Sequence, residues 1–103
     1  MRNLTKADFD QVVASNELVL VEFGASWCQP CRQLEPVLEE LSQELSGTAL
    51  IAKVDIDVEM EIARRPAFSI QSAPTLILFK SGTPVSMCGF RPKQAIKEMI
   101  LSA

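Results

Sequence analysis

Trp27-Cys28-Gln29-Pro30-Cys31 marks the point where a strand pattern gives way to a helical one. The residues before it, 18–23, form a nearly continuous apolar run that predicts a strand buried on both faces. After it, apolar residues recur at spacings of three and four, which predicts an amphipathic helix from Cys28 to about Leu45. The first cysteine therefore lies at a helix N-terminus, where unpaired backbone N–H groups carry partial positive charge and favour a thiolate.

The neighbouring segments predict an α/β fold. Residues 49–54 form a second buried strand, and the strand, helix, strand order implies a right-handed crossover and a parallel pair. The other expected elements are a very short strand near residues 2–4, a helix over about 6–15 after the capping-box pattern Thr5-Lys6-Ala7-Asp8, a short helix capped by Asp57, a strand over 75–79, a turn at Ser81-Gly82 with a return strand over 85–90, and a helix that opens at Pro92. We expect a single domain over residues 1–103, with a central mixed sheet of four or five strands flanked by four helices.

Composition argues against several classes of partner. With 48% hydrophobic and 22% charged residues, the chain should fold as a soluble globule. A formal net charge of -3 gives no electrostatic footprint for nucleic acid or an anionic membrane, and no apolar run approaches the ~20 residues that cross a bilayer. No N-terminal stretch has the pattern of an export signal, so we expect a cytoplasmic protein. Three cysteines cannot all pair within one chain, so at least one thiol stays free.

The chain resembles the thioredoxin family over essentially its whole length. A bare Cys-x-x-Cys is a weak signal, but further segments match in the family's order and at nearly its spacing: Val19 to Phe23, Trp27-Cys28-x-Pro30-Cys31, Pro36, Ala52-Lys53-Val54-Asp55, Ala73-Pro74-Thr75, Ser81-Gly82 and Gly89. The resemblance implies the thioredoxin fold and a thiol-disulfide oxidoreductase that reduces protein disulfides without a bound cofactor or metal. It also implies disulfide-containing target proteins and a separate thioredoxin reductase as electron donor.

The resemblance assigns catalytic roles to the two cysteines and to a buried charged pair. Cys28 should be the thiolate that attacks a target disulfide, and Cys31, one helical turn on and more buried, the resolving thiol. Glu22 interrupts an apolar strand, so desolvation should raise its pKa and suit it to accept the proton of Cys31. Lys53 on the neighbouring strand is its expected counterion. The alternatives are ordinary core cysteines, and a carboxylate and lysine at a strand edge with the lysine reaching solvent.

The family's target-binding surface maps to the motif and to two distant segments. Pro74 matches the family's cis-proline, beside which free backbone groups hold a target peptide as a short added strand. Trp27 should supply apolar surface, with core packing as the alternative, and Gly89 should let a target approach closely, with a plain strand glycine as the alternative. The expected target-binding residues are Trp27, Gln29, Pro30, Ala73, Pro74 and Gly89.

The sequence departs from the family's pattern around the motif. Gln29 replaces a glycine common in reducing members, so we expect a shifted redox potential and altered target fit. Glu22 stands where the family usually has aspartate, and Gly24 where many relatives have a second tryptophan. Two extra residues lie in the region of Arg65-Pro66-Ala67-Phe68, which borders the Pro74 loop.

Cys88 lies outside the motif and immediately precedes Gly89. We expect a monomer in which this thiol could act as a regulatory site or link two chains on oxidation, the alternative being a half-packed small hydrophobe. Three other functions stay open: a disulfide oxidase or isomerase, a binding or scaffold subunit that uses the Trp27, Pro74 and Gly89 surface, and a metal site formed by all three cysteines. The metal site is the weakest, because zinc prefers four N/S ligands and the chain has no histidine.

Overall fold

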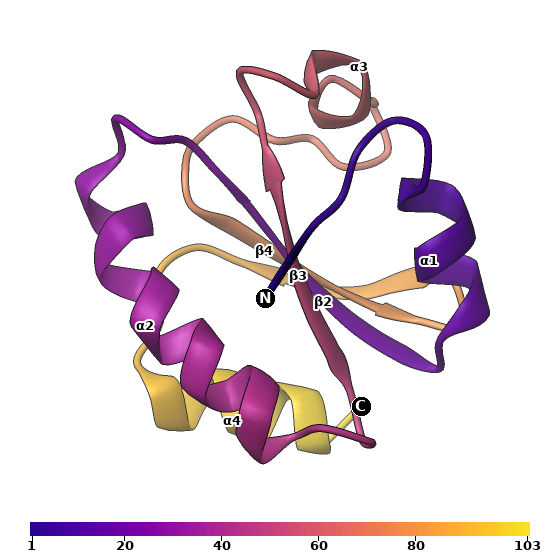
Figure 1. The fold of residues 1–103 in the computed structure, drawn as a ribbon, viewed down its shortest axis with the longest axis vertical. Helices are drawn as coiled ribbons and strands as arrows, with labels where there is room; N and C mark the ends of the chain where they lie inside the picture. Colours follow the sequence, from indigo (N-terminus) through magenta and orange to yellow (C-terminus); the bar gives the residue numbers. More distant parts are fainter.

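A five-stranded mixed sheet forms the centre of the molecule, with its strands in the order β1-β3-β2-β4-β5 (Figure 1). The structure is a computed structural model and describes residues 1–103. β1, β3 and β2 are parallel, whereas β4 pairs antiparallel with β2 and β5. The strands are Arg2–Asn3 (β1), Leu18–Gly24 (β2), Leu50–Asp55 (β3), Thr75–Lys80 (β4) and Thr83–Cys88 (β5). The mixed sheet is as expected, and the very short first strand brings it to five strands.

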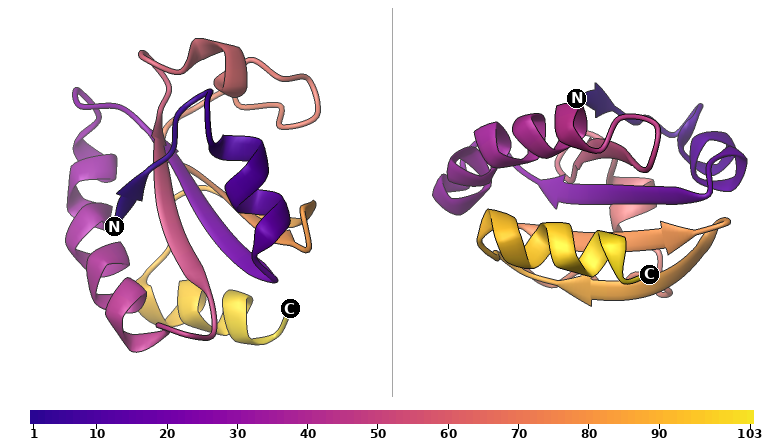
Figure 2. Two further views of the ribbon diagram at one scale, coloured as in Figure 1. Left: turned by 45° about the vertical axis from the view of Figure 1, so that its right-hand side comes forward. Right: turned by 90° about the horizontal axis from the view of Figure 1, so that it is seen from below.

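Two pairs of helices cover the two faces of this sheet. They are Phe9–Ser15 (α1), Gln29–Glu44 (α2), Met60–Ala63 (α3) and Lys93–Leu101 (α4). Apolar side chains of α1 and α3 share one core cluster with the sheet, and those of α2 and α4 share a second cluster on the opposite face. Figure 1 and Figure 2 show α2 and α4 together on one side of the strands and α1 on the other. No helix is long and apolar enough to span a membrane.

Alternation along β2 decides which side chains reach each face. Val21 and Phe23 point into the cluster under α1, whereas Leu20 packs beneath α2 and α4. Because strand side chains alternate with period two, Glu22 and position 24 lie on the same face as Leu20. Residues 19–24 are all buried, so the expectation of a strand covered on both faces is confirmed.

The first helix starts later than its sequence pattern predicts. The capping box is present, since the Ala7 amide donates to Thr5 Oγ1 and the Thr5 amide donates to Asp8 Oδ1. These bonds hold residues 5–8 in a turn, and regular helix begins only at Phe9.

The predicted role of Asp57 as a helix cap was wrong. The Asp55 carboxylate accepts the amides of Asp57 and Val58 at 2.9 and 3.3 Å, and α3 begins later, at Met60. Asp55 is the last residue of β3, and from there its carboxylate is already placed to accept the amides of the following turn. The side chain of Asp57 is thereby left for another partner.

The hairpin between β4 and β5 turns at the expected residues. Ser81 and Gly82 have φ values of 51° and 87°, the left-handed conformation that a two-residue hairpin turn needs at both positions. The return strand begins at Thr83, two residues earlier than predicted, because so short a turn pairs Thr83 directly with Lys80.

Candidate active site

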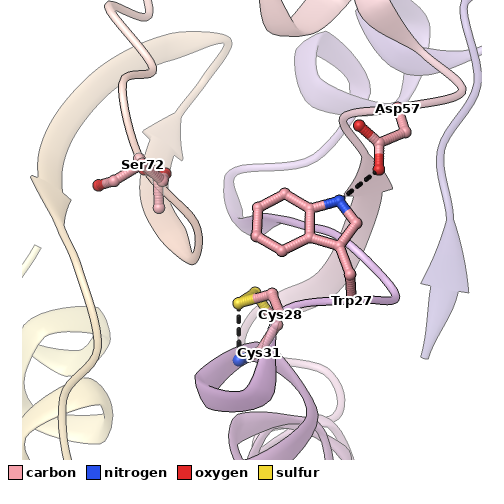
Figure 3. Close-up of a disulfide and its surroundings, with 6 residues drawn as sticks. Trp27, Cys28, Cys31, Asp57 and Ser72 are labelled. Carbon is pink, nitrogen blue, oxygen red and sulfur yellow. Dashed lines mark hydrogen bonds between the residues drawn. A yellow bond between two sulfur atoms is a disulfide. The ribbon is translucent and has the colours of Figure 1, made fainter.

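Cys28 and Cys31 form a disulfide at the junction of β2 and α2. Cys28 is the N-cap of α2, with extended backbone angles, and its Sγ accepts the amide N–H of Cys31 at 3.1 Å (Figure 3). Pro30 occupies the first turn, where its missing N–H leaves no helical bond unmade. A sulfur that accepts a backbone N–H at a helix N-terminus is stabilised as a thiolate once the disulfide opens.

The two cysteines are buried to nearly the same extent. Cys28 is 3% exposed and Cys31 5%, so the expectation that Cys31 would be the more buried was wrong. Ile56 and Ala73 pack against the small cluster that contains both cysteines, so these two side chains help to bury Cys28 as well as Cys31. The disulfide therefore lies just beneath the surface, covered by the residues that pack around it.

Trp27 supplies exposed apolar surface next to Cys28. Its side chain is 67% exposed, which rules out core packing for this residue. The indole Nε1 donates a hydrogen bond of 2.7 Å to Asp57 Oδ2, and this bond holds the ring beside the disulfide (Figure 3). Sequence reasoning missed Asp57 as a site residue, because a carboxylate after a strand is equally typical of a helix cap.

The loop before β4 lies opposite the cysteine pair. The Ala73–Pro74 peptide bond is cis, as the resemblance implies. The Thr75 hydroxyl donates to the Ser72 carbonyl at 2.6 Å and fixes the turn, and Figure 3 shows Ser72 on the loop that lies opposite Trp27. A Cβ added at Gly89 would lie 3.7 Å from the Pro74 carbonyl oxygen, so the end of β5 borders the same loop. The structure thus brings the predicted target-binding segments together.

Gln29 lies between the cysteines and faces solvent. Its Oε1 accepts a hydrogen bond of 3.2 Å from Arg32 Nη2, one turn along α2. The side chain therefore adds an amide group to the exposed rim of the disulfide.

Glu22 is a buried carboxyl next to Cys31. The residue is 5% exposed, and its Oε2 is buried without a hydrogen-bond partner. Burial raises the pKa of Glu22 to about 7, against an opposing effect of the Lys53 charge and with a further rise from Glu35 and Asp55. A carboxyl with such a pKa exchanges a proton readily near neutral pH.

The expected ion pair between Glu22 and Lys53 is not formed. The two residues are register partners on β2 and β3, yet Lys53 Nζ lies 2.7 Å from Glu35 Oε1. The long lysine side chain passes the buried carboxyl and reaches the more exposed carboxylate on α2, where both charges keep part of their hydration. Glu35 was missed at the sequence level, although its position four residues after Cys31 places both on one helix face.

A cavity of about 250 Å³ joins these groups. Its lining includes Glu22, Gly24, Cys31, Glu35, Lys53 and Asp55. The buried carboxyl of Glu22 and the Cys31 side chain therefore share one polar space with the Lys53–Glu35 pair.

Cys88 is a free, half-buried cysteine at the end of β5. Its Sγ lies 4.0 Å from Met99 Sδ on α4, and burial raises the pKa of the thiol, an effect that Arg91 opposes. No group of three or more cysteine, aspartate or glutamate side chains is placed to hold a metal ion, so the suggested site of three cysteines was wrong.

Comparison with known proteins finds thioredoxins. The family model described as Thioredoxin matches residues 1–102. A curated thioredoxin of Staphylococcus aureus is 44% identical over 98 residues, which cover 94% of this chain and 91% of that protein. A structure of Plasmodium falciparum thioredoxin superposes with a TM-score of 0.89 at 33% identity, covering 99% of this chain and 98% of the other. A mutant thioredoxin from Halobacterium salinarum gives a TM-score of 0.88 at 35% identity, with coverage of 98% and 88%.

Proposed function

Because this chain belongs to the thioredoxin family and is a thiol-disulfide oxidoreductase that reduces protein disulfides, we propose a cycle in which Cys28 attacks and Cys31 resolves. The Cys28 thiolate attacks one sulfur of a target disulfide, and the other target sulfur leaves as a thiolate. Cys31 then attacks Cys28 Sγ, and the second target sulfur leaves. The target gains two electrons, and the Cys28–Cys31 disulfide seen in the structure is the product.

The hydrogen bond from the Cys31 amide to Cys28 Sγ is the observation that carries this assignment. It puts Cys28 at the N-cap of α2, where the helix dipole and the amide favour negative charge on sulfur. Cys31 lies inside the first turn, so its own sulfur has no such position. The attacking role therefore suits Cys28.

Glu22 is the group proposed to accept the proton of Cys31. The resolving thiol must lose its proton before it can attack, and the carboxyl shares its cavity. Burial without a partner for Oε2 supports the role, because such a carboxylate gains stability when it takes a proton. Lys53 acts at longer range, through its charge, and pairs directly with Glu35.

Target segments are proposed to bind across the surface formed by Trp27, Gln29, Pro30 and the Pro74 loop, with Gly89 at its border. Exposure of the indole supports an apolar contact there. Pro74 itself is buried, whereas Ala73 is half-buried, so the free backbone groups of the loop would meet an extended peptide.

Targets of a protein with this activity are disulfide-containing proteins, and a reductase restores the dithiol. We assign that step to a separate thioredoxin reductase, and place the protein in the cytoplasm as a monomeric electron carrier. Gln29 is proposed to tune the redox potential and target fit. A role as a non-catalytic binding subunit would use the same exposed surface, but the formed disulfide favours turnover.

Reduction of insulin by dithiothreitol tests the cycle. The parent should accelerate insulin precipitation, and both Cys28→Ser and Cys31→Ser should fall to the uncatalysed rate. Cys88→Ser is the matched control, because it removes a thiol outside the motif and should retain parental activity. Activity in either motif variant equal to that of the parent would contradict the reductase cycle and favour the binding-subunit role.

A further inference from the structure

Gly24 closes β2 in a backbone conformation that any residue can adopt. Its φ does not lie in the left-handed region, in contrast to Gly47 and Gly82, whose φ values are both 87°. Backbone geometry therefore gives no reason for glycine at position 24. The reason has to come from what surrounds its Cα.

The space above Gly24 is filled by the carboxyl group of Glu22. A Cβ built at position 24 would overlap Glu22 Oε2 and would lie 2.9 Å from Glu22 Cδ. The same point lies 3.2 Å from Cys31 Sγ. Residues two apart on a strand share a face, so the side chain of one directly competes with that of the other. The carboxyl thus occupies the place of the missing side chain, next to the resolving sulfur.

No other group fixes the carboxyl in this position. Oε2 has no hydrogen-bond partner, and the neighbouring cation, Lys53, is held by Glu35. With no hydrogen bond to hold it, the carboxyl approaches Cys31 as closely as the space above Gly24 allows. A methyl group at position 24 would force the flexible end of Glu22 to move elsewhere in the cavity, which Lys53 and Asp55 also line.

We infer that Gly24 is a positioning residue, whose missing side chain lets the carboxyl of Glu22 reach Cys31. The inference rests on the proposed role of Glu22 as proton acceptor. During resolution the Cys31 thiol gives its proton to Glu22, the new S–S bond forms to Cys28, and the target sulfur leaves with the electron pair of the broken bond. Displacement of the carboxyl slows the proton transfer but leaves the attack by Cys28 unchanged.

A double-mutant cycle tests the coupling between positions 22 and 24. Gly24→Ala should lower insulin-reduction kcat by ~10-fold at pH 7, below the 10²–10⁴ that a positioned acid or base can contribute. In the Glu22→Asp background the same change should alter kcat less than about twofold, because the shorter carboxyl stops before the space at position 24. The new methyl group at position 24 approaches Cys31 Sγ equally closely in both backgrounds, so any effect of that contact cancels in the comparison.

Two further measurements separate positioning from general damage. The alkylation rate of Cys28 by iodoacetamide in the reduced protein should be unchanged in Gly24→Ala, while the Glu22 carboxyl titration, followed by ¹³C NMR, should shift. Gly82→Ala is the control for lost stability, since it strains the distant β4–β5 turn at a φ of 87°. It should lower the melting temperature without changing the pH profile of turnover.

The inference is overturned if Gly24→Ala lowers kcat equally in the parent and in the Glu22→Asp background, or if it leaves kcat unchanged when Glu22 is present. If Gly24→Ala alone fails to fold, recovery of folding in the double variant supports the coupling, and failure of both variants overturns it. Glu22→Gln tests the underlying role separately. If Glu22→Gln has the same kcat as the parent, the proton-acceptor role fails. The positioning role of Gly24 is judged separately, and it fails if the Glu22 titration is unshifted in Gly24→Ala.

Discussion

Lys53 Nζ lies 2.7 Å from the carboxylate of Glu35 on α2, although Glu22 is its register partner on the adjacent strand. The cation of the site is thus shared between two carboxyls and bonds directly to the more exposed one. Because Glu22 keeps an unpartnered oxygen, its protonation is governed mainly by burial. We therefore expect Glu35, which lines the same cavity, to influence the protonation of Glu22 by its own charge and by its hold on Lys53.

Replacement of Glu35 by glutamine should lower the pKa of Glu22. The change removes a negative charge that raises this pKa and frees Lys53, whose charge lowers it. Since Glu22 must be deprotonated to accept a proton, the acid limb of the kcat profile should move to lower pH. Glu40 lies on α2 like Glu35 but pairs with Lys93 on α4, so Glu40→Gln should leave the acid limb in place. An unmoved or raised limb in Glu35→Gln would show that the pair has no part in tuning Glu22.

The raised pKa of Glu22 also predicts a pH dependence of stability. The folded state binds this proton more tightly than the unfolded state, because burial raises the pKa from 4.5 to about 7. Its contribution is fully present below the unfolded pKa and is lost as pH rises through about 7. Relative to the parent, Glu22→Gln should therefore gain up to about 3 kcal/mol in unfolding free energy between pH 4.5 and pH 8.

Urea unfolding of the oxidised forms at several pH values measures this difference. Glu17→Gln, an exposed substitution before β2, should track the parent throughout. A constant offset between Glu22→Gln and the parent would mean that Glu22 titrates alike in the folded and unfolded states.

The order of elements was predictable from apolar periodicity, because each strand and helix buries a regular set of side chains. The buried run of β2, the crossover through α2 and the Ser81-Gly82 turn all follow from local patterns. Their ends were less predictable. The Thr5 and Asp8 side chains form hydrogen bonds to a turn before α1, and Asp55 rather than Asp57 accepts amides of the turn before α3, so local polar competition decides where these helices begin.

The site was predictable only as far as neighbours along the chain or the strand determine it. Cys28 at the helix start and Glu22 in an apolar strand are local facts, and both were found. The choice of Lys53 between two carboxylates depends on side-chain reach across three elements, and the overlap of Glu22 with position 24 depends on a rotamer. Neither feature can be predicted from the spacing of residues in the sequence.

Cys88 should be a slowly reacting thiol. It packs against Met99 at 4.0 Å, and burial raises its pKa, so little thiolate forms at neutral pH. Under mild oxidation, non-reducing gels should show similar amounts of covalent dimer for the parent and Cys88→Ser. A dimer that forms in the parent and disappears in this variant would instead identify Cys88 as the regulatory thiol that links two chains.

The bond between Trp27 and Asp57 should control target binding more than chemistry. Loss of the 2.7 Å contact in Asp57→Ala frees a ring that is 67% exposed, so the apolar surface beside Cys28 is no longer fixed before a target arrives. A hydrogen bond of about 1 kcal/mol corresponds to a rise in KM for a protein disulfide of about fivefold. The value of kcat should change little, because neither residue takes part in sulfur or proton transfer. Asp57→Asn keeps an acceptor oxygen at the same reach and should restore most of the loss, as steady-state insulin reduction and tryptophan fluorescence anisotropy can measure. A fall in kcat at constant KM would assign the pair to the reaction itself and contradict its role in holding the binding surface.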